Sequence, residues 1–366
     1  MSTPAGAEGE FRDVPRQDYG ASRPAFRVVR AGLLTTLQDL GRYGLQHFGI
    51  VPGGAMDAVA HRIANALVGN SVDAATLECT MRGPTLVAED DALIALYGAA
   101  FDATADGHAL PCNRPVLIKI GTTLAIGTTG APGQGARAYL AIAGGFQVPA
   151  VLGSRSTYLP AGFGGLSGRA LKAGDVLDGV PDLKQLSASR SQHLVQSQTP
   201  TGTARPRSVR WFAPVLNRLP TGEMTVRAME GRHYSQFDTA SRDAFFGERW
   251  RIAPDSNRMG YRLAGPRLAR KRDALADILS EPTCLGTIQV PNDGAPIALM
   301  ADHQTTGGYP KIAEITSADM PGLAQLAPGG SVRFVRCSLD EAEAARLAAE
   351  AKVRQLLEGL AWNYEM

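Results

Sequence analysis

The sequence predicts a mainly β protein whose strands are divided between two β-rich halves and whose chain ends in a helix. Glycine (41 residues) and proline (23 residues) are frequent, while charged residues make up 20% and aromatic residues 6% of the chain. This mix favours many tight turns over a helical bundle. Short apolar runs recur about every ten residues between turns that contain Gly or Pro, a spacing typical of a barrel or sandwich.

The N-terminal segment, residues 1–24, contains Gly, Ala, Pro and charged residues without periodicity, and we expect it to be disordered. Strands are predicted at 26–29 and 33–37, followed by a glycine-rich loop. Apolar residues from 56 to 67 then recur at helical spacing, which predicts an amphipathic helix that ends at Gly69. Asp57 lies in the first turn, where a carboxylate favours the helix dipole. This interaction is a sufficient structural reason for an aspartate at position 57. His47, on the glycine-rich loop, has no comparable structural reason.

The rest of the first half, predicted to span residues 25–180, consists of candidate strands at 93–97, 116–120, 123–126 and 138–143. Arg155 follows them, flanked by serines and glycines. It fits an anion contact, and it fits an ordinary surface arginine nearly as well. Residues 181–207 are rich in Ser, Gln, Thr and Pro without an apolar period, so we predict a linker there.

The second half is predicted to span residues 208–337. Strands are expected at 209–213, 224–228, 250–253 and 332–335, with a short helix at 238–246 capped by Asp238 or Thr239. Ser338 with Glu341 three residues later forms a capping box, and apolar residues continue at helical spacing. The segment 338–366 is therefore predicted to be a helix that packs on the rest of the protein.

The most informative stretch follows a predicted hairpin. Two apolar runs, 286–290 and 296–300, flank Pro291-Asn292-Asp293-Gly294, and Asn and Gly favour a tight turn. The second run leads into a dense group of polar residues and glycines: Asp302, His303, Gln304, Thr305, Thr306, Gly307, Gly308, Tyr309 and Lys311. A core hairpin has no stability reason to end in so many functional groups, so we predict a site in which the glycine N–H groups form a nest for an anion or carbonyl. The alternative is a polar loop that satisfies its own backbone.

Several classes of protein are disfavoured. A net charge of +2 without a basic run gives no argument for nucleic-acid binding. The four cysteines are far apart, which indicates neither a zinc site nor a disulfide framework. No apolar run approaches the ~18 residues of a membrane span, and no signal peptide is recognisable, so we expect a cytoplasmic protein. The sequence has no GxxxxGK[ST], GxSxG, HExxH or Met-Lys-Met motif, and no metal site is predicted.

Long motifs connect the chain to a known family. Gly286-Thr287-Ile288-Gln289-Val290-Pro291 and the run 304–313 (QTTGGYPKIA) resemble the biotin-dependent carboxyltransferase-like family, as do the segments 35–42 and 54–57. That family includes the KipA-type subunit of prokaryotic 5-oxoprolinase and the carboxyltransferase part of urea carboxylase. The resemblance extends over residues 31–334. Asn257, where the family pattern has an acid, and His303, where it has an arginine, depart from it.

The resemblance implies two tandem cyclophilin-like β-barrel domains with a few short helices. It implies a subunit that works with a KipI-type partner and a LamB/YcsF-type subunit in ATP-dependent ring opening of 5-oxoproline to glutamate. ATP is used by the complex, and no cofactor is bound by a recognisable motif in this chain. Two alternatives stay open: carboxyl transfer from carboxybiotin to urea or a related amide, and a non-catalytic regulator that antagonises a KipI-like kinase inhibitor.

All enzymatic alternatives need donors that polarise a carbonyl, because a lactam or urea is a poor electrophile. We predict that Lys311, Tyr309, Gln304 and Thr305 are these donors, and that Asp302 or Asp57 holds the substrate N–H. The further predicted substrate contacts are Gly307, Gly308, Arg258, Tyr261, His47 and Arg155. Lys311 is expected to be an exposed charge whose replacement by methionine lowers activity without changing the melting temperature.

Overall fold

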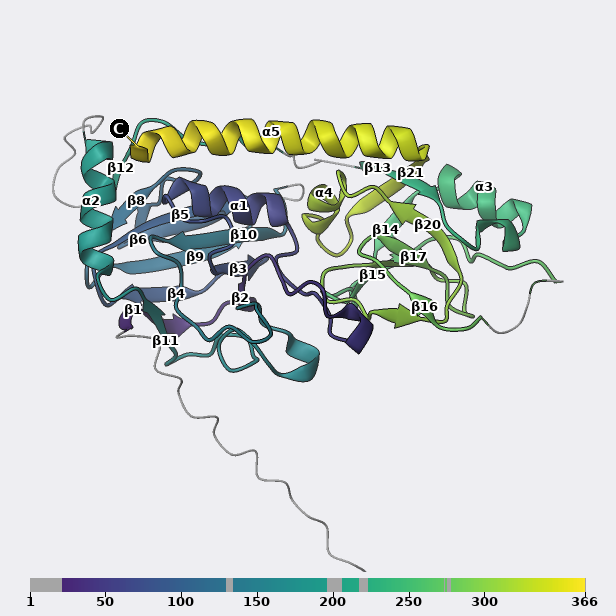
Figure 1. The fold of residues 1–366 in the computed structure, drawn as a ribbon, viewed down its shortest axis with the longest axis horizontal. Helices are drawn as coiled ribbons and strands as arrows, with labels where there is room; N and C mark the ends of the chain where they lie inside the picture. The colour runs from purple at the N-terminus through teal and green to yellow at the C-terminus, as the bar shows by residue number, and fades with distance from the viewer. Residues whose placement is uncertain are drawn as a thin grey trace, which may run out of the picture.

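The computed structural model describes residues 22–129, 134–195, 206–216, 223–272, 274 and 278–365, which form two β-rich halves beneath one long helix (Figure 1). The predicted mainly β class is confirmed. Within the described residues, no helix combines the length and the apolar character that crossing a membrane requires.

The first half contains two six-stranded sheets. In order across the first sheet, the strands are Val176–Gly179 (β11), Arg23–Arg30 (β1), Thr85–Ala88 (β4), Thr123–Thr129 (β9), Phe101–Ala105 (β6) and His108–Ala109 (β7). In order across the second sheet, they are Arg207–Ser208 (β12), Val116–Ile118 (β8), Ala92–Gly98 (β5), Arg137–Ile142 (β10), Thr76–Thr80 (β3) and Leu34–Gln38 (β2). Because β5 and β10 are central strands, their residues are nearly all buried and read as continuous apolar runs.

The second half is a closed barrel. Its strands, in order around the barrel, are Glu223–Glu230 (β13), Lys311–Ile315 (β20), Thr287–Gln289 (β17), Ile297–Leu299 (β18), Gly260–Ala264 (β15), Trp250–Ile252 (β14) and Ser331–Arg336 (β21). The predicted hairpin is confirmed, since β17 and β18 pair antiparallel across the Pro291–Gly294 turn. A separate two-stranded ribbon joins Glu281–Pro282 (β16) to Thr306–Gly307 (β19).

The helices are Ala58–Leu67 (α1), Leu183–Val195 (α2), Thr239–Gly247 (α3), Met320–Ala324 (α4) and Leu339–Glu365 (α5), with short 3₁₀ helices at Gln46–Phe48 (η1), Leu159–Ala161 (η2) and Tyr234–Gln236 (η3). The predicted helices α1 and α3 are confirmed, with Asp57 and Asp238 as their capping residues. Ile63 and Leu67 of α1 are fully buried against the first half.

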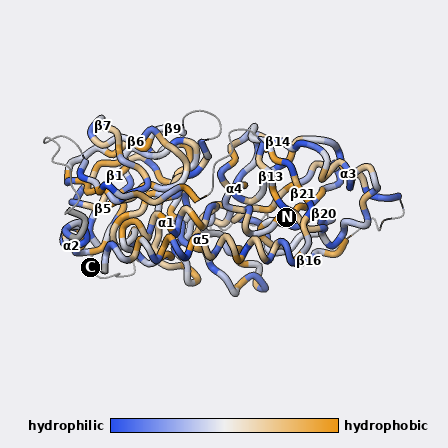
Figure 2. Tube along the Cα trace, turned by 90° about the horizontal axis from the view of Figure 1, so that it is seen from above, coloured by the Kyte–Doolittle hydropathy of each residue, from blue (hydrophilic) through white to orange (hydrophobic). Residues whose placement is uncertain are grey.

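Seen from above, the two halves lie side by side, with α4 near their junction (Figure 2).

The C-terminal helix α5 runs over both halves (Figure 1). Its predicted capping box is present: the Ser338 N–H donates to Glu341 Oε2 over 2.7 Å, and the Glu341 N–H donates to Ser338 Oγ over 3.2 Å. Leu360 is buried with the core of the first half, and the Tyr364 hydroxyl donates to the carbonyl of Leu67 in α1. At its other end, the carbonyl of Ala342 accepts from the Thr316 hydroxyl of the second half over 3.5 Å, so the helix contacts both halves.

Three sequence predictions about chain boundaries need correction. Order begins before residue 25, because Arg23 and Pro24 already pair with β11; residues 1–21 lie outside the described part. The predicted linker 181–207 contains helix α2, whose Leu183 is fully buried, although residues 196–205 lie outside the described part. No strand forms at 209–213: Val209 and Ala213 instead pack in the core of the first half, which places the start of the second half at β13.

Candidate functional site

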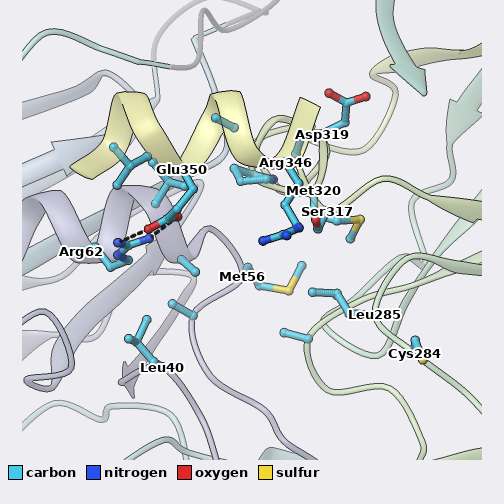
Figure 3. A pocket seen from close by; sticks show the side chains of 18 of the residues that line it. Leu40, Met56, Arg62, Cys284, Leu285, Ser317, Asp319, Met320, Arg346 and Glu350 are labelled. Carbon is cyan, nitrogen blue, oxygen red and sulfur yellow. Dashed lines mark hydrogen bonds and ion pairs between the residues drawn. The ribbon is translucent and has the colours of Figure 1, made fainter. Parts of the chain in front are cut away.

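A cleft with a volume of about 800 Å³ lies between the two halves beneath α5. Figure 3 shows Leu40, Met56 and Arg62 on one side of it and Leu285, Ser317 and Met320 on the other. The cleft is within the size range of small-molecule sites, which often occur at domain boundaries. Its position makes it the strongest candidate for a binding site among the described residues.

A buried ionic network lies next to this cleft and joins the two halves. The guanidinium of Arg258 donates from Nη1 to Glu78 Oε1 over 2.5 Å, and from Nε and Nη2 to the Asp302 carboxylate over 2.9 and 3.0 Å. Its Nη2 also donates to the carbonyl of Gly54 over 2.5 Å. Glu78 lies on β3 in the first half, while Arg258 and Asp302 belong to the second. All three side chains are almost completely buried, so each charge depends on its partners for compensation.

A second set of contacts crosses the same boundary. Arg137 of β10 donates from Nη1 to the Tyr261 hydroxyl over 2.6 Å, and Gln325 Nε2 donates to Asp57 Oδ2 over 2.7 Å. Gln325 Oε1 also accepts from the Arg137 N–H over 3.0 Å. Two of the predicted contact residues, Tyr261 and Asp57, are thus buried in the interface and do not line the cleft.

Burial and charge set the protonation of this interface. Burial raises the pKa of the Glu78 carboxyl, but Arg258 and Arg137 together outweigh it and hold that pKa below its ordinary value. Burial is the main influence on the pKa of Asp57, and with the nearby Glu78 charge it raises that pKa to about 6. Hydrogen bonds from Ala60 and Gln325 oppose this rise. Asp57 therefore titrates closer to neutrality than an ordinary aspartate does.

This raised pKa predicts a pH-dependent stability. Between about pH 4 and pH 6 the folded Asp57 holds a proton that the unfolded chain has lost, so stability falls as pH rises through that window. Asp57→Asn removes this titration. We expect the unfolding free energy of the wild type, relative to Asp57→Asn, to fall by about 2 kcal/mol between about pH 4.5 and pH 7.5, as measured by urea unfolding. A difference that does not change with pH would contradict the assignment.

His303 lies on the wall of the cleft contributed by the second half. Its Nδ1 lies 2.7 Å from the carbonyl of Gln304, and because a carbonyl only accepts, Nδ1 carries the proton. Burial lowers the pKa of His303, so the ring is neutral and Nε2 is left as a hydrogen-bond acceptor or base. In the sequence, His303 belongs to the polar group after the hairpin and departs from the family pattern, but no role was predicted for it. In the structure, His303 is a titratable group of this wall with a neutral, basic ring nitrogen.

Lys311, the predicted main donor, is not exposed as expected. It is 6% exposed, and its Nζ donates to the carbonyl of Pro282 over 2.5 Å and to Glu281 Oε2 over 3.4 Å. The strand β20 directs it toward the segment 281–283, whose last residue, Thr283, lines the cleft. Lys311 therefore lies behind the cleft wall. The sequence alone does not indicate this partner segment.

The glycines beside Lys311 serve close packing. A side chain at Gly307 would place its Cβ 2.6 Å from Gln289 Nε2, and one at Gly308 would come within 3.1 Å of the carbonyl of Ile278. Neither glycine has a positive φ, so the predicted nest of backbone N–H groups is not formed. Gln304, also predicted to be catalytic, donates from Nε2 to Gln289 Oε1 over 3.0 Å.

The predicted site residues therefore separate into groups. Asp302, Arg258, Tyr261 and Asp57 meet in the interface, while Lys311, Gln304 and Gly307 meet at the barrel wall behind the cleft. Thr305 and Gly308 are neighbours of this second group in sequence, and Tyr309 is 47% exposed. His47 is exposed on η1, and Arg155 is held near Asp39 by its backbone N–H. None of these predicted residues lines the cleft itself.

Two charged residues of the interface, Glu78 and Arg137, were not predicted from the sequence, and the pattern that could have indicated them is weak. Glu78 is the middle residue of β3 and Arg137 is the first residue of β10, and both charged side chains are buried. A charge at a buried strand position needs a buried partner, which points to an interface. The sequence does not show which segment supplies that partner. No group of three or more potential metal ligands exists among the described residues.

Comparisons with known proteins agree with this architecture. The model of a family described as carboxyltransferase domain, subdomain A and B, matches residues 48–336. The C subunit of Escherichia coli 5-oxoprolinase is 42% identical over 92% of this chain and 98% of its own length. The urea amidolyase of Lachancea kluyveri is 34% identical over 92% of this chain but 18% of its own length. The crystal structure of Kluyveromyces lactis urea carboxylase matches with a TM-score of 0.79 at 30% identity, over 93% of this chain and 30% of that one.

Proposed function

Because the chain belongs to the carboxyltransferase domain family, we propose that it is the C-type subunit of an ATP-dependent 5-oxoprolinase, which opens the ring of 5-oxoproline to give glutamate. The observation that carries the proposal is the 42% identity to the C subunit of the E. coli 5-oxoprolinase, which extends over 98% of that protein. The urea-processing relatives are less identical, and the chain spans about a fifth of the length of the urea amidolyases.

The chemistry needed is hydrolysis of a lactam. The ring C–N bond breaks, water supplies a hydroxyl to the carbonyl carbon, and the nitrogen takes a proton. From the barrel side, the cleft offers this substrate the neutral imidazole of His303, while the hydroxyl of Thr283 beside it already donates to the carbonyl of Gln304. An acceptor such as Nε2 of His303 suits the lactam N–H, and the Thr283 oxygen, whose proton is already engaged, can offer a ligand only an acceptor.

The chain is proposed to act with a KipI-type and a LamB/YcsF-type subunit. Its sequence has no phosphate loop of the usual type, so we assign ATP binding to the assembled complex and not to a recognisable motif of this subunit. We place the complex in the cytoplasm, where ATP is available. The purified chain alone is expected to show no ATP hydrolysis.

Reconstitution tests the proposal. The three subunits together are expected to convert 5-oxoproline to glutamate with consumption of ATP, and omission of this chain is expected to abolish turnover. Glutamate formation and ADP release are measured in parallel. Unchanged turnover without this chain would contradict the proposal, as would ATP hydrolysis by the chain alone that disappears when one of its own residues is replaced.

The second candidate is carboxyl transfer from carboxybiotin to urea or a related amide. It is favoured by the TM-score of 0.79 with urea carboxylase, since that likeness covers 93% of this chain. Adding a biotin carboxylase, a biotinylated carrier protein, bicarbonate and urea to the chain separates the two functions. ATP-dependent fixation of labelled bicarbonate into urea would support the second candidate over the first.

A further inference from the structure

The cleft carries an excess of positive charge. Its lining includes four cationic and two acidic side chains, which leaves two positive charges: Arg62, Arg227, Arg346 and Lys352 against Asp319 and Glu350. In a concave site such an excess favours an anionic ligand. Urea and simple amides carry no charge, whereas 5-oxoproline carries a carboxylate next to its ring.

Two of these cations are already neutralised. Arg62 makes a bidentate contact with Glu350 over 2.8 and 2.9 Å (Figure 3). Arg227 holds Asp319 through Nη2 and Nε over 2.6 and 2.9 Å. Both guanidinium groups thus already have a carboxylate in the fork geometry that arginine prefers.

Arg346 differs from both. Its acidic neighbour within the described part of the chain is Glu343, one turn away on the same helix, at 3.9 Å between Nη2 and Oε1. That distance is too long for a hydrogen bond. Figure 3 shows the Arg346 side chain reaching from α5 into the cleft, toward Ser317 and Met320. Its fork is therefore available to a ligand.

We propose that Arg346 is the anchor for the substrate carboxylate, and that α5 thereby determines the preference of the cleft for an acidic lactam over an uncharged amide. The inference rests on the proposed function and deepens it. A guanidinium binds a carboxylate through two parallel hydrogen bonds, which fixes the orientation of the ring as well as its position. The lactam group is then directed toward the remaining walls, where His303 and Thr283 lie.

The test compares two ring compounds that differ in the carboxylate. Dissociation constants of the full chain for 5-oxoproline and for 2-pyrrolidinone are measured by equilibrium dialysis, together with KM of the assembled complex for 5-oxoproline. Arg346→Gln is expected to reduce the preference for 5-oxoproline over 2-pyrrolidinone by roughly 10- to 100-fold, the size of a lost charge-assisted contact. Arg346→Lys is expected to restore part of it.

Arg354→Gln is the matched control, since Arg354 is an exposed arginine of the same helix outside the cleft. It is expected to leave the preference unchanged. A preference that Arg346→Gln alters by less than about twofold would overturn the anchor, and so would a wild-type chain that binds both compounds equally or neither. If the assembled complex does not hydrolyse 5-oxoproline but the dialysis shows the Arg346-dependent preference, the proposed function fails and the carboxylate site stands.

Discussion

Replacement of Arg258 by methionine is expected to lower the free energy of unfolding by about 3–5 kcal/mol. Arg258 is 4% exposed and compensates two buried carboxylates, Glu78 from the first half and Asp302 from the second. Methionine fills part of the space that Arg258 occupies. The Asp302 carboxylate then loses this guanidinium, and the Glu78 carboxylate keeps only Arg137, whose Nε lies 3.9 Å from Glu78 Oε1, as a cationic partner among the described ion pairs. The uncompensated charges, and not the lost contact area, account for the size of the effect.

The control for this variant is Arg262→Met. Arg262 lies four residues away and pairs with Asp255 over 2.9 Å, but both side chains are more than half exposed. An exposed pair contributes about 0–1 kcal/mol, so this variant should unfold close to the wild type. Urea unfolding of both variants measures the difference. Equal losses in the two variants would show that the interface network does not hold the halves together.

Replacement of Lys311 by methionine is expected to affect both stability and activity. Without the buried Lys311 ammonium, the carbonyl of Pro282 loses its donor, and the Glu281 carboxylate keeps its ion pair with Arg232. We expect the free energy of unfolding to fall by about 1–3 kcal/mol. Because segment 281–283 forms part of the cleft wall, we expect kcat/KM of the assembled complex to fall by about tenfold as that wall loosens. Lys311 acts here as a positioning residue for Thr283.

The same variant tests the direct role predicted from the sequence. A lysine that polarises the substrate carbonyl would lose roughly 10²–10³ in kcat with its melting temperature unchanged. A positioning lysine loses stability, and Lys311→Arg restores much of both quantities because the charge near Glu281 is retained. Thermal unfolding and steady-state kinetics on the same preparations distinguish the two roles.

The elements that local sequence determines could be predicted. Helix α1 with its Asp57 cap, the β17–β18 hairpin and the capping box of α5 each depend on residues close together in the chain. Helix α2 could not be predicted, because its sequence is polar and only tertiary contacts stabilise it. One of these is the Leu93 N–H, which donates to Ser187 Oγ over 2.9 Å.

The site itself was only partly predictable. The polar residues after the hairpin do approach functional positions, since His303 lines the cleft and Asp302 joins the buried network. Their partners come from far away in the chain: Glu78 is 180 residues from Arg258. Helix α5 was expected only to pack, yet it contributes Arg346 to the cleft. No periodicity in a single sequence identifies which distant segments close a cavity together.

The central claim is that substrate binds in the cleft between the halves. The most direct test fills that cleft with a large side chain. Ala345 lies on α5 and lines the cleft, while its neighbour Ala344 is exposed outside it. We predict that Ala345→Trp lowers kcat/KM of the assembled complex for 5-oxoproline by at least about tenfold, or about 1.4 kcal/mol, at an unchanged melting temperature, and that Ala344→Trp does not. An Ala345→Trp complex that assembles, melts and turns over like the wild type would contradict the claim.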